Sequence, residues 1–202
     1  MASETTLPPT LESPGAGLPA FELTWIRIMF RLACGLISKN LSLRWFKFEA
    51  ERIKTLAGNI SAEQGAVPVL INRVVGIEDS SRYWSVFMVL DHLRIVDEGI
   101  TQIVETLTDD RLFGQEVRIQ DVKPSPQSGS ETIERFRKAV DGYESTVIRL
   151  GILGRRVRHP HPWFGPMTAH DWHCLAAIHH WVHRRQLERI VGTLPEEART
   201  QR

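Results

Sequence analysis

The chain has 202 residues, a length that suits one domain of ordinary size with short appendages. Apolar residues make up 42% and charged residues 24%, which is a globular composition and excludes a wholly disordered chain. The 25 Lys and Arg residues against 24 Asp and Glu leave a net charge of +1, so the charge balance gives no indication of a nucleic-acid partner.

The two cysteines, Cys34 and Cys174, lie far apart in the sequence. A disulfide framework like that of small secreted proteins is therefore not expected, and a reducing, cytoplasmic location fits better. Residues 1–20 are rich in Pro, Ser, Thr and Gly and lack the apolar core of a signal peptide. They are predicted to form a disordered tail.

Residues 22–38 are predicted to form an amphipathic helix, because apolar side chains recur there at three- and four-residue steps. Glu22, Arg27 and Arg31 interrupt the apolar run, which argues against a transmembrane span. Packing of this helix on its own domain is favoured, and docking on a membrane surface or on a partner is the alternative.

Four further helices follow from the apolar periodicity, near residues 43–57, 80–107, 130–150 and 168–191. Asn40 and Ser42 are candidate N-caps of the first of these helices. Thr168 is the expected N-cap of the last helix, with Asp171 in a capping-box position. Gly58 and the residue after it indicate where the first of the four helices ends.

The predicted helix at 80–107 has a wide apolar stripe with one polar residue at each edge. His92 lies at one edge and can point toward a core, whereas Asp97 at the other edge is expected to reach solvent. The long connection at 109–129 is either functional or loosely packed. Within it, residues 117–119 alternate like a short strand.

These elements predict an all-α fold, because little strand signal accompanies them. If successive helices pack as neighbours, the fold is an up-down-up-down four-helix bundle with an extra N-terminal helix. The domain is expected at residues 21–192, with its core at about 43–191 and a polar tail at 193–202.

Two histidines stand on the apolar face of the last predicted helix. His179 and His183 are one turn apart and lie among Trp172, Leu175 and Val182, whereas His170, His173 and His180 fall outside that face. Buried imidazoles need partners, and two histidines at positions i and i+4 can bind one metal ion. The zincin mechanism is excluded, because His180 stands where that motif requires Glu.

A third histidine has to come from elsewhere in the chain, and His92 is the best candidate. Three histidines and an open position are typical of a catalytic metal site. Zinc, nickel, iron, cobalt and manganese are all compatible with such a set. Gln186, on the same face as the pair, is a candidate second layer that would orient a ligand imidazole.

Each of these residues also has a plainer interpretation. His92, His179 and His183 can be interior histidines bonded to nearby polar groups, and Gln186 can tie two helices together. His159 and His161 are expected to shape a loop, or to line the mouth of a pocket. The arginines of the last helix are expected to form a solvated face; they are Arg184, Arg185 and Arg189.

At these positions the sequence resembles the DinB superfamily. The resemblance rests on His92 in the second bundle helix, on the segment His161-Pro162-Trp163-Phe164-Gly165 before the last helix, and on His179-x-x-x-His183-x-x-Gln186. It covers residues 43–191, and the order and spacing of these short motifs carry it. The N-terminal tail and the helix at 22–38 look like additions to the family pattern.

The resemblance implies a four-helix bundle with a divalent metal ion held by His92, His179 and His183 at one end. It also implies a homodimer, and an activity as a hydrolase or as a thiol S-transferase acting on a small molecule, with a low-molecular-weight thiol as cosubstrate. Zinc or nickel is the expected metal. The alternative is a non-catalytic bundle that binds a partner and keeps a structural or vestigial site.

Overall fold

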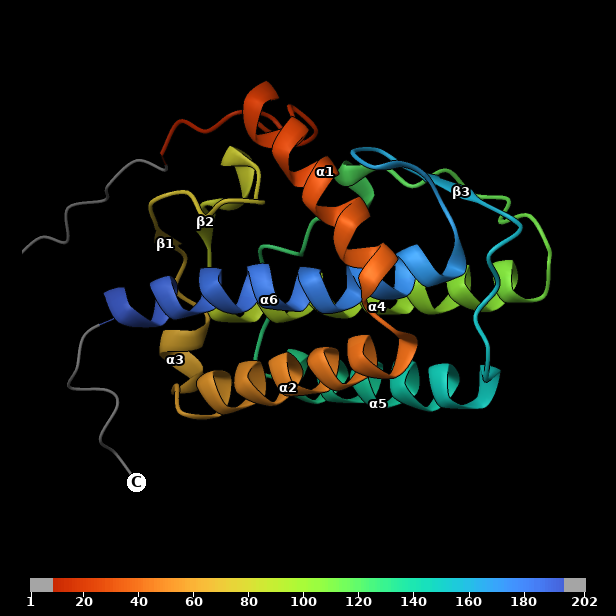
Figure 1. Ribbon diagram of the computed structural model, residues 1–202. Coiled ribbons are helices and arrows are strands. Elements are labelled where there is room, and N and C mark those ends of the chain that lie inside the picture. The colour runs from red at the N-terminus through yellow and green to blue at the C-terminus, as the bar shows by residue number, and fades with distance from the viewer. Residues whose placement is uncertain (1–8, 195–202) are drawn as a thin grey trace, which may run out of the picture.

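The computed structural model describes residues 9–194, and most of these residues are helical (Figure 1). The α-helices are α1 (Ala20–Leu36), α2 (Lys39–Gly58), α3 (Ala62–Gly65), α4 (Val86–Thr108), α5 (Glu131–Leu150) and α6 (Ala169–Thr193). Two 3-10 helices are η1 (Asp79–Ser81) and η2 (Ile119–Val122). The strands form two antiparallel pairs, β1 (Val69–Leu70) with β2 (Tyr83–Trp84), and β3 (His159–His161) with β4 (Gly165–Met167). The predicted all-α class is confirmed.

The four long helices α2, α4, α5 and α6 form the bundle, but their order around it differs from the prediction. Extensive contacts join α2 to α6, α6 to α4, and α4 to α5, and α5 closes the ring against α2. Successive helices are therefore neighbours only at α4 and α5. Buried apolar side chains from all four helices fill the centre, among them Phe46, Leu90, Phe136 and Leu187.

Side-chain contacts give the direction of each helix. The hydroxyl of Ser42 lies 3.3 Å from the carbonyl oxygen of His173 and Arg52 pairs with Glu188 at 3.2 Å, so α2 and α6 run parallel. Helices α4 and α5 are also parallel, with the start of α5 beside the start of α4. The predicted up-down-up-down order is wrong: the bundle runs up-down-down-up.

The parallel pair α4 and α5 explains the long connection at residues 109–130. A chain that leaves the end of one helix has to return along the bundle before it can begin a parallel neighbour. The strand predicted at 117–119 is wrong, because this segment passes into η2 instead. The carbonyl oxygen of Val122, at the end of η2, accepts a hydrogen bond from His92 on α4. The connection thus returns directly over the first turns of α4.

Several helix ends are set by capping side chains. Helix α4 begins at Val86 rather than near residue 80, because the hydroxyl of Ser85 accepts the backbone N–H of Met88 at 3.1 Å. Helix α2 has Ser38 as its N-cap, not Asn40 or Ser42. The predicted capping box of Thr168 and Asp171 at the start of α6 is present.

The N-terminal segment differs from the expected disordered tail where it is described. The backbone amides of Gly15 and Gly17 donate to the carboxylate of Glu78, and Leu18 is buried. Residues 1–8 and most of the tail predicted at 193–202 lie outside the described residues. The division of the chain into a domain at 21–192 with two tails remains a prediction.

Helix α6 lies at the centre of the packing. The sequence predicted that His170, His173 and His180 lie outside its apolar face, but all three are buried. His170 lies 3.1 Å from the carbonyl oxygen of Cys34, and His173 lies between the hydroxyl of Tyr143 at 2.6 Å and the backbone of α2. His180 is fully buried in the bundle. These side chains are buried because α1, α2 and α4 all pack on α6.

Two charged groups expected in solvent are buried as well. Asp97 has no exposed surface, and both of its carboxylate oxygens lie within 3.0 Å of Nε2 of His180. Burial raises the pKa of the Asp97 carboxyl, and the His180 partner opposes this. Arg184 is buried in a pair with Glu49. Each charge is tolerated because it meets an opposite charge or a donor.

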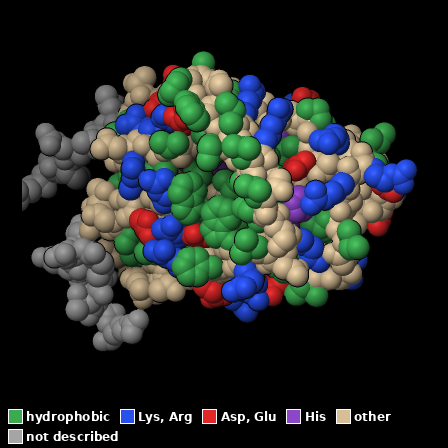
Figure 2. Space-filling model, in the orientation of Figure 1, with side chains coloured by type: hydrophobic (Ala, Val, Ile, Leu, Met, Phe, Trp, Pro, Cys, Tyr) green, Lys and Arg blue, Asp and Glu red, His purple; other side chains and the backbone are tan. Residues whose placement is uncertain are grey.

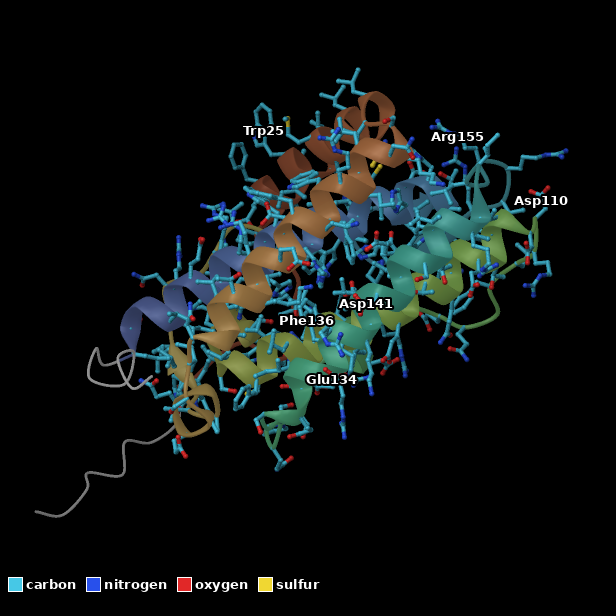
Figure 3. All side chains as sticks on the ribbon, turned by 90° about the horizontal axis from the view of Figure 1, so that it is seen from below. Trp25, Asp110, Glu134, Phe136, Asp141 and Arg155 are labelled. Carbon is cyan, nitrogen blue, oxygen red and sulfur yellow. The ribbon has the colours of Figure 1, made fainter. Side chains whose placement is uncertain are left out.

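Helix α1 crosses over α6 instead of joining the bundle (Figure 1). Phe30 stacks on Phe164 with ring centroids 4.3 Å apart, so the inner face is packed on the domain. The outer face exposes large apolar side chains, including Phe21, Trp25, Met29 and Leu36. Hydrophobic side chains gather over this region in Figure 2, and Trp25 projects outward in Figure 3. None of the described helices is long and apolar enough to cross a membrane.

We predict that Asp97→Ala destabilises the protein by about 3–5 kcal/mol, because it leaves His180 in the core without its charged partner. Urea unfolding followed by circular dichroism measures this change. Glu98→Ala is the matched control, because the Glu98 side chain is half exposed and pairs only at the surface. It should cost less than about 1 kcal/mol. Equal effects of the two substitutions would refute the role of the buried pair.

Candidate metal centre

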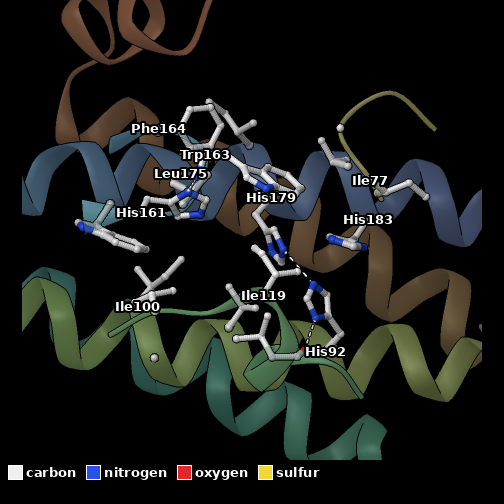
Figure 4. A pocket seen from close by; sticks show the side chains of 18 of the residues that line it. Ile77, His92, Ile100, Ile119, His161, Trp163, Phe164, Leu175, His179 and His183 are labelled. Atoms are coloured by element: carbon white, nitrogen blue, oxygen red, sulfur yellow. Dashed lines mark hydrogen bonds between the residues drawn. The ribbon is translucent and has the colours of Figure 1, made fainter. Parts of the chain in front are cut away.

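Three histidines from two helices meet inside the bundle. His92 lies in the second turn of α4, and His179 and His183 are one turn apart in α6. Because α4 and α6 are antiparallel and in extensive contact, the start of α4 faces the second half of α6. The three rings point toward one another between these helices (Figure 4).

The distances fit a common ligand position. Nε2 of His92 lies 3.1 Å from Nε2 of His179, and one ring nitrogen of each of the three histidines lies within 4.8 Å of the others. Two nitrogens bonded to one tetrahedral ion at about 2.0–2.1 Å stand roughly 3.3 Å apart. The His92–His179 separation therefore matches that of two nitrogens bonded to one ion. A ring nitrogen of His183 is near enough to be the third ligand.

Hydrogen bonds fix the tautomers of two of the rings. Nδ1 of His92 lies 2.6 Å from the carbonyl oxygen of Val122, which can only accept, so Nδ1 carries the proton. Nδ1 of His183 donates to Oε1 of Gln186 at 2.7 Å. The amide orientation of Gln186 follows from its nitrogen, which donates to the carbonyl oxygen of Ser81 at 2.7 Å. Nε2 of His92 and Nε2 of His183 therefore present lone pairs to the centre.

Burial keeps these rings neutral. It lowers the pKa of His92 to about 4, against a smaller opposing effect of the Val122 hydrogen bond. The pKa values of His179 and His183 are also held well below the usual range, first by burial and then by neighbouring imidazoles. Neutral imidazoles are the form that binds metal ions.

A divalent ion satisfies what the protein leaves unsatisfied here. The Nε2 lone pairs of His92 and His183 both point into the centre. The third ring, His179, can offer them at most one hydrogen, on its own Nε2. Such convergence of acceptors is costly unless a cation binds between them. The donor set of three imidazole nitrogens suits zinc, nickel, iron or cobalt better than magnesium or calcium.

Beside the three histidines lies a cavity of about 560 Å³, a volume typical of small-molecule sites. Helices α4 and α6 form its floor, α1 covers it, and residues 113–123 close one side. Its walls are mainly apolar and aromatic, with contributions from Phe30, Trp45, Ile100, Trp163, Trp172 and Trp181. A ligand that enters this cavity therefore reaches the histidines through a mainly apolar space.

The charged groups at the cavity largely neutralise one another. The ammonium group of Lys123 lies 3.0 Å from the carboxylate of Glu78 and also contacts the hydroxyls of Ser80 and Ser81. Arg118 pairs with Asp121 at 2.8 Å near the rim. Among the described residues, no carboxylate belongs to the three-histidine group.

His161 also lines the cavity, as one of the two roles expected for it, whereas His159 packs against Trp172. The backbone N–H of Trp163 donates to Nδ1 of His161 at 3.0 Å, so the proton of the neutral His161 ring is on Nε2. Burial lowers the pKa of His161 to about 3. His161 is thus a neutral hydrogen-bond donor in an otherwise apolar wall (Figure 4).

The structure brings together the residues singled out in the sequence and adds others. Gln186 contacts His183, and it also ties α6 to the backbone of Ser81, so both interpretations of this side chain describe real contacts. The carbonyl of Val122 and the ring of Trp84, which lies 5.1 Å from His92, were not expected. A backbone carbonyl leaves no residue-type signal, so only the path of the 109–130 connection reveals it.

Comparison with known proteins agrees with this geometry. A family model described as the DinB superfamily matches residues 16–187. The match includes α1 as well as the bundle helices, and it contains all three histidines and Gln186. No curated protein and no solved structure matches the chain.

We predict opposite tautomers for two of these histidines in the metal-free protein. Nitrogen-15 NMR should show His92 protonated at Nδ1 and His161 protonated at Nε2, both neutral from about pH 8 to pH 5 because burial opposes charging. His170 is the control, because its contact with the Cys174 thiol raises its pKa, so its ring should be positively charged at about pH 5. A positively charged ring of His92 or His161 above about pH 6, with both ring nitrogens protonated, would contradict this prediction.

Proposed function

We propose that this chain, which belongs to the DinB superfamily, binds one divalent metal ion through His92, His179 and His183 and uses it in chemistry on a small molecule. The convergence of three neutral imidazoles on an apolar cavity is the observation that carries this proposal. Zinc and nickel suit the donor set best. The favoured reaction class is thiol S-transfer, and hydrolysis is the second.

A divalent ion bound there would supply one kind of chemistry, namely a lowered pKa for water or a thiol and polarisation of an electrophile's oxygen. The protein's own groups supply the rest. Val122 and Gln186 hold the rings of His92 and His183 in the tautomers that leave Nε2 free. The apolar walls exclude water, and Nε2–H of His161 can hydrogen-bond to an oxygen of the substrate.

The choice between transfer and hydrolysis rests on the groups around the site. Hydrolysis requires a proton acceptor for the attacking water, and no carboxylate accompanies the three histidines in the described part of the chain. A thiol ionises far more readily than water and needs no such base near a cation. A low-molecular-weight thiol cosubstrate is therefore favoured over water as the nucleophile.

The alternative is a binding protein in which the same site is structural. Its support is the outer face of α1, where exposed apolar side chains such as Trp25, Met29 and Leu36 invite a partner. The same face supports a homodimer, which we also propose.

The two buried free thiols, Cys34 and Cys174, favour the proposed cytoplasmic location, since they stay reduced there.

Metal content tests the proposal directly. We expect purified protein to bind about one equivalent of Zn²⁺ or Ni²⁺ per chain, and His183→Ala to bind less than about 0.2 equivalent. His159→Ala is the control, because His159 packs away from the three rings against Phe113, and it should keep the metal. Equal metal contents of the two variants, with both proteins folded by circular dichroism, would reject the site.

Gln186 tests whether the orientation of His183 matters. Gln186→Leu should weaken Zn²⁺ affinity by about 10–100-fold, because Nδ1 of His183 loses its acceptor and the ring is no longer held. Competition against a zinc-binding dye measures the change. Gln186→Glu keeps an acceptor for Nδ1 of His183 and should recover most of the affinity. Both variants lose the bond to Ser81, so a difference between them reports on the orientation of His183.

A further inference from the structure

The cavity next to the three histidines places one kind of constraint on the molecule that enters it. Four tryptophans line it, namely Trp45, Trp163, Trp172 and Trp181, together with aliphatic residues of α1 and α4. Apolar walls reward apolar ligand surface, at roughly 0.8 kcal/mol for each buried methylene. A small polar molecule gains nothing from these walls and loses its hydration in entering.

Charge at the floor of the cavity sets a second constraint. Imidazole binds a metal ion in its uncharged form, so three histidine ligands would offset none of the charge of a divalent ion held between them. Among the charged side chains of the wall, Lys123 pairs with Glu78 and Arg118 pairs with Asp121, and Glu116 also lines the wall near Arg118. A double positive charge in an apolar space favours a negatively charged ligand head.

The arrangement also separates the two ends of such a ligand. His179 and His183 lie in the middle turns of α6, and His161 lies beside Leu175, one turn nearer the start of this helix, so the cavity extends from the three rings toward the start of α6 (Figure 4). Helix α1 covers this extension with Ile26, Met29 and Ala33. A ligand head at the histidines therefore has its body under α1.

We propose that this site takes an apolar molecule with a single anionic head, such as an alkyl or aryl thiol or acid, whose body lies between α1 and α6. This inference rests on the proposed metal site and deepens it by naming the substrate class. It separates the protein from enzymes that act on polar or sugar-like substrates. The aromatic walls, the convergence of the three imidazoles and the extension of the cavity under α1 carry it together.

Straight-chain hydroxamates test the proposal, because they share one anionic metal-binding head and differ only in apolar length. With Zn²⁺-loaded protein in a calorimeter, affinity should rise about fourfold per methylene, or about 200-fold from acetohydroxamate to hexanohydroxamate. Hexanamide, which lacks the anionic head, should bind at least about tenfold more weakly than hexanohydroxamate. A rise of less than tenfold across the series, or equal binding of hexanamide, would overturn the inference.

A substitution that fills the extension locates the ligand body. Ala33→Trp should weaken hexanohydroxamate binding at least about tenfold and leave acetohydroxamate within about twofold, because Ala33 lines the cavity under α1. Ala20→Trp is the matched control at an exposed position of the same helix and should change neither affinity. Loss of affinity for both ligands alike, or for neither, would overturn the placement.

Metal content is measured first for every sample, which keeps the two proposals distinguishable. Protein that takes up no Zn²⁺ would reject the proposed function and this inference together. Protein that binds Zn²⁺ but shows a flat hydroxamate series would reject only the substrate class. If Ala33→Trp alone loses metal, Ile26→Trp on the same wall replaces it, with the same expected split between the long and short ligands.

Discussion

Helix α6 is buried on several sides, and much of the remaining structure follows from this packing. It contacts α1, α2 and α4, so six of its polar side chains are buried and have to find partners inside the protein. His173 bonds to Tyr143 and to the backbone of α2, and His180 bonds to Asp97. Arg184 meets Glu49. These contacts hold His173, His180 and Arg184 against protein groups, whereas His179, His183 and His92 each bring one ring nitrogen to a common point.

The same packing links the site to the route of the chain. Because α4 and α5 run parallel, the segment between them has to return along the bundle, and it passes over the start of α4. There the carbonyl of Val122 orients His92, and the side chain of Lys123 joins Glu78 and two serines beside the cavity. The N-terminal segment is attached to the same carboxylate through Gly15 and Gly17. One side of the cavity, the orientation of one histidine and the ion pair of Glu78, to which the N-terminal segment is bonded, thus depend on a single connection.

The histidines show how similar residues acquire different roles through their surroundings. His180 and His179 are adjacent in sequence, yet one is paired with a carboxylate in the core and the other faces the cavity. His161 is buried and neutral like His92, but its Nδ1 accepts a backbone hydrogen where that of His92 donates one. Protonation at opposite ring nitrogens makes one a candidate donor to a substrate and the other a candidate metal ligand.

From neighbouring residues alone one can predict the helical class, the long helices to within about six residues at each end, the capping box of α6 and the histidines that could share a ligand. Periodicity and capping are local, so they can be predicted in this way. The directions of the helices, the burial of Asp97 and His180, and the acceptors that orient His92 and His183 follow from the three-dimensional packing. These depend on which helices meet and on backbone groups with no residue-type signal. A single helix face cannot reveal them, because α6 is covered on more than one side and its polar residues are satisfied by segments distant in sequence.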